Sequence, residues 1–225
     1  YDNGPGKHQG PVFSIQRNPT HNKFFMTIGD WTAKIWTEDV KTPIITTKYH
    51  NSYLTGGCWS PTRPGVFYVT SMDGMLDIWD FFHRQDEVTY SHKVGNVALS
   101  SIGVQGNSQF GGKLVAVGDA NGSVSLLEVC DSLAVPQQNE KAVINSMFER
   151  ETKKEKNLEV RERELKRAMI LELEKERKGS AGAKVDESEE METVLRKIDQ
   201  DFMAMLQSED NEEGNESYSD DTATC

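Results

Sequence analysis

The sequence predicts an all-β fold built from β-propeller blades, followed by a long α-helix and an acidic tail. Three observations support this prediction: a repeat of about 43 residues, a stretch after Pro136 without Pro or Gly, and acidic residues concentrated near the end. Periods of roughly 40–45 residues are typical of propeller blades, each of which is a small antiparallel sheet.

Four positions that recur in register define the repeat. The two His residues are 42 positions apart, and the other three pairs are each 43 apart. The recurring residues are His8, Thr27, Asp30 and Trp36 in the first unit and His50, Thr70, Asp73 and Trp79 in the second. Apolar or alternating runs between them predict strands, with residues 10–15 and 54–60 as inner strands. The Asp-Gly pair within residues 72–75 predicts a tight hairpin turn, because these residues tolerate a positive φ.

A third unit is present in weaker form, with residues 114–119 and 123–129 as its strands. Aligning Asn121-Gly122 with Asp73-Gly74 places Leu127 where Trp79 stood and Gly118 where Thr70 stood. Such a unit can still stack as a degenerate repeat. About three blades cannot close a ring. We therefore expect the last three blades of a seven-bladed ring, in the C-terminal part of a longer protein whose N-terminal portion is missing before Tyr1.

The repeated residues resemble those of WD-repeat (WD40) proteins. In that family the His, Ser/Thr, Asp and Trp of one blade form a buried hydrogen-bond network, which implies a structural role for both sets of four. A catalytic role as a hydrolase is the alternative. It is not favoured, because buried polar groups need partners in any case, the same set occurs twice, and no nucleophile elbow accompanies it.

Neither the cysteines nor the histidines indicate an enzyme. Cys58, Cys130 and Cys225 are far apart and predict reduced thiols. None of the five His residues has the spacing with Cys or Glu that zinc sites show. We therefore expect no catalytic residue, no metal and no cofactor.

The charge distribution argues against nucleic acid and membrane as direct partners. Residues 1–136 hold 10 basic and 12 acidic side chains, whereas residues 179–225 hold 3 basic and 14 acidic ones. A polyanionic partner needs clustered positive charge, which this chain lacks. The sequence contains no apolar run of about 18 residues, the length that a membrane-spanning helix needs.

The predicted domain boundaries follow from these patterns. Residues 1–136 are expected to hold the blades, 137–178 a long charged helix, 179–190 a flexible linker, 191–207 an amphipathic helix and 208–225 a disordered acidic tail. Between Glu149 and Lys178, 20 of 30 residues are charged, 11 of them basic and 9 acidic. This interleaving favours a solvated, ion-paired helix over a nucleic-acid clamp.

Two groups of apolar residues in these helices are candidate partner contacts. The group at the start of the long helix also includes Ile144 and is expected to seat the helix on the propeller. The group in the amphipathic helix either docks in a groove of a partner or folds back on the propeller rim. The candidates are Val143, Met147, Phe148, Val194, Leu195, Ile198, Phe202, Met205 and Leu206.

Six stretches resemble the WD-repeat intermediate chains of axonemal dynein, and within these the outer-arm type. They lie between about residues 10 and 160, and the match continues past the third unit into the predicted helix. The stretches are residues 10–19 (GPVFSIQRNP), 29–36 (GDWTAKIW), 47–50 (TKYH), 59–67 (WSPTRPGVF), 72–81 (MDGMLDIWDF) and 145–152 (NSMFERET).

This resemblance implies a non-motor subunit of a ciliary motor. Family members bind the tail of a dynein heavy chain through the propeller, pair with a second intermediate chain, and recruit light chains through an N-terminal region that is absent here. Microtubule association is then expected through the complex, in the axoneme of a cilium or flagellum, with a cytoplasmic preassembly pool. An intermediate chain of inner-arm or cytoplasmic dynein, and another WD40 scaffold, are the alternatives.

Overall fold

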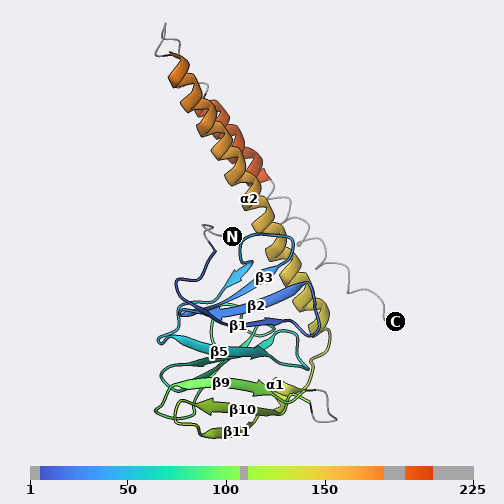
Figure 1. The fold of residues 1–225 in the computed structure, drawn as a ribbon. Helices are drawn as coiled ribbons and strands as arrows, with labels where there is room; N and C mark the ends of the chain where they lie inside the picture. The colour runs from blue at the N-terminus through green and yellow to red at the C-terminus, as the bar shows by residue number, and fades with distance from the viewer. Residues whose placement is uncertain (1–5, 107–110, 180–190, 205–225) are drawn as a thin grey trace, which may run out of the picture. The chain divides into compact units, whose positions relative to one another are not determined.

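The computed structural model describes residues 6–106, 111–179 and 191–204. The chain divides into two compact units, residues 1–155 and 156–225. The first unit contains three antiparallel sheets that follow one another along the chain and lie in layers (Figure 1).

The first two sheets have four strands each, in the order of the sequence. The first consists of β1 (Val12–Arg17), β2 (Phe24–Gly29), β3 (Thr32–Thr37) and β4 (Ile45–Thr46). The second consists of β5 (Leu54–Trp59), β6 (Val66–Ser71), β7 (Met75–Asp80) and β8 (Tyr90–Lys93). Each sheet corresponds to one unit of the sequence repeat, because consecutive strands joined by short turns pair with each other.

The third sheet has three strands, β9 (Leu99–Val104), β10 (Leu114–Asp119) and β11 (Val124–Glu128), with β10 in the centre. Strand β9 was not anticipated from the sequence, whereas β10 and β11 lie where the weak third unit predicted strands. The three sheets and the long helix that follows them confirm the predicted array of propeller blades with a helical extension.

Apolar side chains hold the sheets together in two clusters. The first joins the facing sides of the first two sheets and includes Met26, Ile35 and Trp79. The second joins the second and third sheets and includes Tyr68 and Val117. The alternation of the strands explains this arrangement, since successive residues of β6 enter different clusters: Val69 lies in the first and Tyr68 in the second.

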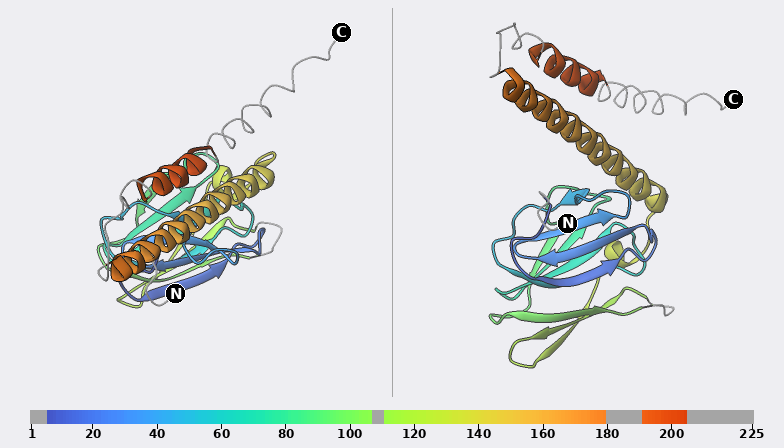
Figure 2. Two further views of the ribbon diagram at one scale, coloured as in Figure 1. Left: turned by 90° about the horizontal axis from the view of Figure 1, so that it is seen from above. Right: turned by 45° about the horizontal axis from the view of Figure 1, so that its top comes forward.

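A short helix α1 (Asp131–Ala134) and a long helix α2 (Glu140–Gly179) follow the sheets. The first turns of α2 lie against the sheets (Figure 2) and bury Ile144, Met147 and Phe148. The ring of Phe148 contacts Phe24 of the first sheet, with ring centroids 4.8 Å apart. These turns therefore complete the core of the first unit.

In the second unit, residues 156–179 of α2 and residues 191–204 are helical. Arg161 forms an ion pair with Asp199, and its guanidinium lies 4.5 Å from the centre of the Phe202 ring. Apart from Gly179, the last residue of α2, the predicted linker lies outside the described residues, and so do the acidic tail, Met205 and Leu206.

The cysteines differ in accessibility, and this difference can be tested. Burial between the second and third sheets raises the pKa of the Cys58 thiol to about 12, whereas Cys130 is exposed. In a Cys225→Ser background we expect iodoacetamide at neutral pH to label Cys130 alone, because the thiolate is the reactive species. Mass spectrometry after digestion reads the label; labelling of Cys58 without denaturant would contradict the described core.

Candidate functional sites: blade networks and the helix anchor

In the first sheet, the structure brings together the four residues that the repeat singled out. The Thr27 hydroxyl lies 2.8 Å from His8 Nε2 and accepts a hydrogen bond of 2.7 Å from Trp36 Nε1. His8 Nδ1 lies 3.1 Å from the Asp30 carboxylate. The network therefore ties the segment before β1 to the β2–β3 hairpin.

Asp30 occupies the hairpin turn with a φ of 51°, a conformation that Asp adopts more readily than most residues. Its carboxylate accepts hydrogen bonds from Gln9 N, Thr32 N and the Thr32 hydroxyl. Burial by itself raises the pKa of Asp30, but these hydrogen bonds and His8 outweigh it and hold the pKa below its usual value. The ionised carboxylate is thus an integral part of this blade.

The second sheet does not form the expected network, which corrects the sequence prediction. His50 Nδ1 lies 2.8 Å from Asp77, not Asp73. Asp73 is exposed and accepts a hydrogen bond from Ser71. The Thr70 hydroxyl donates to the carbonyl of Gly56, 3.2 Å away.

The length of the hairpin turn explains this difference. Two residues separate β2 from β3, whereas three separate β6 from β7, where Gly74 has a φ of 81°. Trp36 therefore pairs with Phe25 of β2, whereas Trp79 pairs with Phe67 of β6. The residue two positions after Phe25 is Thr27, but the residue two positions after Phe67 is Val69. A one-residue change of register turns Thr70 to the opposite face.

The third sheet also has a longer turn than the first, with four residues between β10 and β11 and Gly122 at a φ of 85°. Leu127 stands at the repeat position that Trp36 and Trp79 hold in the earlier sheets, and it packs against the second apolar cluster. Asp119 stabilises the turn by accepting hydrogen bonds from Asn121 N and Ser123 N. This blade is therefore held by apolar contacts and a local turn, as the degenerate repeat predicted.

The sequence analysis missed a buried cluster of charges that anchors helix α2. Arg63, at the turn between β5 and β6, is fully buried, and so are Asp80 and Glu140. Its guanidinium donates hydrogen bonds of 2.7 Å to Asp80, 2.9 Å to Glu140 and 2.7 Å to the carbonyl of Ser132. One side chain therefore connects β7, α1 and the first residue of α2.

The guanidinium remains charged in this position. Burial lowers its pKa, but the hydrogen bonds and charges of Glu140 and Asp80 outweigh burial and raise the pKa above its usual value. Glu140 also accepts a hydrogen bond of 3.0 Å from Gln137 N, which satisfies a backbone donor at the start of the helix. Since Asp80 and Glu140 are 17 and 77 residues from Arg63, no local sequence pattern could have revealed this cluster.

The candidate partner contacts at the start of α2 are only partly available. Met147 and Phe148 belong to the core of the first unit, where they seat the start of the helix against the sheets, as expected from the sequence. Val143 is 48% exposed, on the side of the helix away from the core. In residues 191–204, Val194 is exposed, while Leu195, Ile198 and Phe202 are half-buried.

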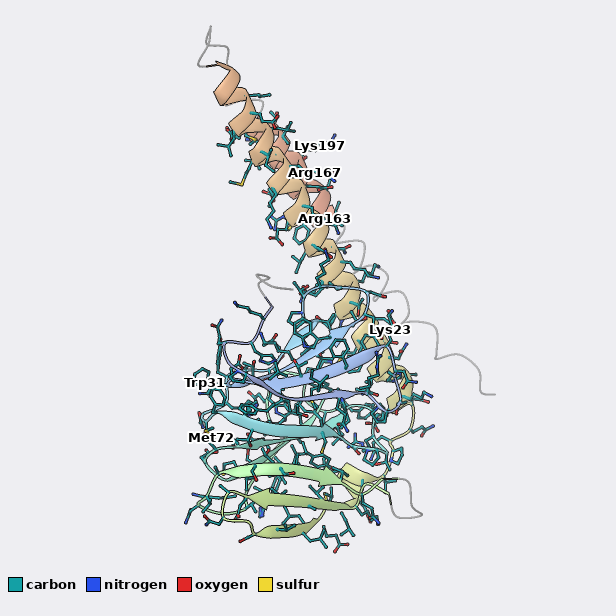
Figure 3. The ribbon with its side chains drawn as sticks, viewed as in Figure 1. Lys23, Trp31, Met72, Arg163, Arg167 and Lys197 are labelled. Carbon is teal, nitrogen blue, oxygen red and sulfur yellow. The ribbon has the colours of Figure 1, made fainter. Side chains whose placement is uncertain are left out.

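Two edges of the first unit differ in chemistry (Figure 3). Trp31 and Met72 lie at one edge, on the hairpin turns of neighbouring sheets, and both are exposed. Lys23 lies at the other edge beside the start of α2, where it pairs with Asp39 at 2.8 Å and Glu149 at 3.3 Å. The helix therefore occupies the edge opposite the hairpin turns.

Within the described ranges, no group of His, Cys, Asp or Glu side chains is arranged to hold a metal ion. In the same part of the chain, no helix combines the length and the apolarity needed to span a bilayer.

The two aspartates at equivalent repeat positions should differ in their effect on stability. We expect Asp30→Ala to lower the free energy of unfolding by about 1–3 kcal/mol, because it leaves buried donors without a partner. Asp73→Ala should cost less than about 0.5 kcal/mol, as is usual for an exposed side chain. Urea denaturation of the two variants measures both values, and equal losses would contradict the register difference between the hairpins.

The contribution of Asp30 should depend on pH in a defined direction. Because the pKa of Asp30 is lower in the folded state, its stabilising effect is present above its ordinary pKa and is lost as the pH falls through the folded value. The difference in unfolding free energy between wild type and Asp30→Asn should therefore shrink below about pH 4. A difference that grows on acidification would contradict this.

Removal of the anchoring cation should be severe. Arg63→Met leaves two buried carboxylates without their partner, and we expect a loss of about 3–5 kcal/mol in unfolding free energy. A double-mutant cycle with Glu140→Met measures the coupling between the two residues, which should exceed about 1 kcal/mol. Additive effects would show that the helix start is held by apolar contacts alone.

Comparison with known proteins identifies the family. A family model described as the WD40 domain of dynein axonemal intermediate chain 3 matches residues 5–129. The chain is 53% identical over 161 residues to a ciliary dynein intermediate chain 3 of Heliocidaris crassispina, covering 71% of this chain and 26% of the relative. It is 51% identical over 154 residues to the 70 kDa intermediate chain of the flagellar outer arm dynein of Chlamydomonas reinhardtii. This alignment covers 68% of this chain and 26% of the relative.

A longer alignment is found with dynein axonemal intermediate chain 2 of Homo sapiens, which is 45% identical over 211 residues, 91% of this chain and 33% of the relative. The chain thus spans about a quarter to a third of the length of these relatives. Because the family model covers more than half of the chain, the chain belongs to the WD40-domain family of axonemal dynein intermediate chains.

Proposed function

We propose that this chain is part of a non-catalytic scaffold subunit of the axonemal outer-arm dynein, located in the cilium or flagellum. In this role the propeller binds the tail of a dynein heavy chain, and the subunit pairs with a second intermediate chain to support arm assembly and motility. The observation that carries the proposal is the similarity to intermediate chains named as ciliary and as flagellar outer arm.

The architecture is suited to a scaffold. Blades packed through two continuous apolar clusters form a rigid body. The start of α2 is fixed to this body by Arg63 and Phe148, with further contacts from Thr42 to Glu155 at 2.9 Å.

The outward faces of the first and third sheets support the proposal that further blades continue the propeller. On β1, Ser14 and Gln16 form hydrogen bonds to the second sheet, so Ile15 points away from it and is 70% exposed. On β11, Leu127 faces the second sheet, whereas Val124, which is 74% exposed, and Leu126 face outward. Apolar faces of this kind match the packing between blades.

An assembly experiment tests the proposed role. An affinity-tagged full-length protein, expressed in ciliated cells that lack the endogenous subunit, should restore outer arms and co-sediment with outer-arm heavy chains from axonemal extracts. Arg63→Met should reduce incorporation into arms, because it loosens the start of α2, while the exposed control Glu38→Gln should assemble normally. Co-sedimentation with inner-arm or cytoplasmic heavy chains alone would instead favour the alternative dynein classes.

A further inference from the structure

The sequence contains two hydroxyl residues directly followed by proline, Thr42-Pro43 and Ser60-Pro61. This dipeptide is the pattern that proline-directed protein kinases recognise. Ser60 is fully buried, and its hydroxyl accepts a hydrogen bond of 3.3 Å from Arg63 N. Thr42 is half-buried and lies in the loop between β3 and β4. Of the two hydroxyls, only that of Thr42 is therefore within reach of another protein.

The loop that carries Thr42 is held at two points and is open between them. Val40 and Ile44 are buried, whereas Lys41 is exposed. Among the described residues, neither Lys41 nor Thr42 forms a backbone–backbone hydrogen bond. Because a proline disfavours the helical conformation of the residue before it, Pro43 biases Thr42 toward an extended backbone. A kinase can therefore take up this loop in extended form without breaking a strand.

The Thr42 hydroxyl contacts α2 at the point where the helix leaves the first unit. It donates a hydrogen bond of 2.9 Å to Glu155 Oε2, and Glu155 is the last residue of that unit. Thr152, three residues earlier, is buried, whereas residues 153 and 154 are exposed. Thr42 therefore supports the helix beyond the turns that are packed on the sheets.

A phosphate on Thr42 would replace attraction at this contact by repulsion. The hydroxyl is a donor, whereas a phosphate offers acceptor oxygens and carries about −1.5 to −2 charges at pH 7. The Glu155 carboxylate is an acceptor as well, so the two groups cannot share a hydrogen bond. Lys23, a cation at the same edge, is already paired with Asp39 at 2.8 Å and Glu149 at 3.3 Å. The local charges thus oppose a phosphate beside Glu155.

We propose that Thr42 is a phosphorylation site, at which a proline-directed kinase releases this turn of α2 from the sheets. In the reaction Thr42 Oγ1 forms a bond to the γ-phosphorus of ATP, and the bond from that phosphorus to the β–γ bridging oxygen breaks. ADP leaves, and the hydroxyl proton passes to a base of the kinase. The helix then leaves the sheets at Thr152 instead of Glu155, while Arg63 and Phe148 keep its start in place. This regulation goes beyond the scaffold role and does not depend on which partner is bound.

The test treats the full-length protein with ATP and a purified cyclin-dependent kinase. Mass spectrometry after digestion should find phosphate on Thr42 and none on Ser60, and Pro43→Ala should abolish the modification of Thr42. Hydrogen exchange of the amides of residues 153–159 should then accelerate about five- to tenfold, because a charged hydrogen bond is replaced by repulsion. The amides of residues 24–29 in β2 should exchange at an unchanged rate.

Three variants separate the contributions to this effect. Thr42→Val removes the hydroxyl without adding charge, and it should accelerate the same amides by about twofold only, as expected for a single hydrogen bond at the surface. In Glu155→Gln, phosphorylation should accelerate exchange by less than about twofold, since the neutral amide does not repel the phosphate and can donate to it. Glu38→Gln is the matched control, because it makes the same change at an exposed position and should respond to phosphorylation as wild type does.

Three results would overturn the proposal. The first is absence of phosphate on Thr42 of the full-length protein; labelling of a synthetic peptide of residues 37–48 in parallel would then show that the fold protects the loop. The second is unchanged or slower exchange after phosphorylation, the slower rate being expected if Lys41 bound the phosphate. The third is equal acceleration in Glu155→Gln and Glu38→Gln, which would exclude repulsion between the phosphate and Glu155.

Discussion

The buried guanidinium of Arg63 is the interaction on which the rest of the structure depends most directly. Two carboxylates and a backbone carbonyl from three elements converge on it. A buried charge is tolerated only where its partners are held in place, so Arg63 positions β7, α1 and the start of α2 together. The aromatic packing of Phe148 on Phe24 depends on that position, because a helix that started elsewhere could not direct Phe148 into the core.

Hairpin length is a second constraint, and it acts through register. One additional residue lies between β6 and β7, and it shifts the register of the hairpin. Val69, which has no hydroxyl, therefore takes the place beside Trp79 that Thr27 has beside Trp36. The first blade is therefore stabilised by a polar network, whereas the second relies on the stacking of Phe67 and Trp79, with ring centroids 5.8 Å apart. The same change leaves the buried Trp79 Nε1 without a hydrogen-bond partner among the described residues.

The distribution of these features is consistent with a scaffold whose parts have separate roles. The facing sides of the sheets are apolar and hold the body together. The edge that carries α2 is occupied by the chain itself through Lys23 and Glu149. The turn residues Trp31 and Met72, at the other edge, are exposed.

The sequence by itself determined the blades and the long helix, because the period of the repeat, the alternation of apolar residues and the absence of Pro and Gly are local properties. It also identified the complete network of His8, Thr27, Asp30 and Trp36. Only the tertiary structure decided which repeat positions face each other: Asp73 matches Asp30 in spacing, yet a longer turn moves it to the surface. The Arg63 cluster joins residues distant in sequence, and such contacts are set by how sheets and helix pack.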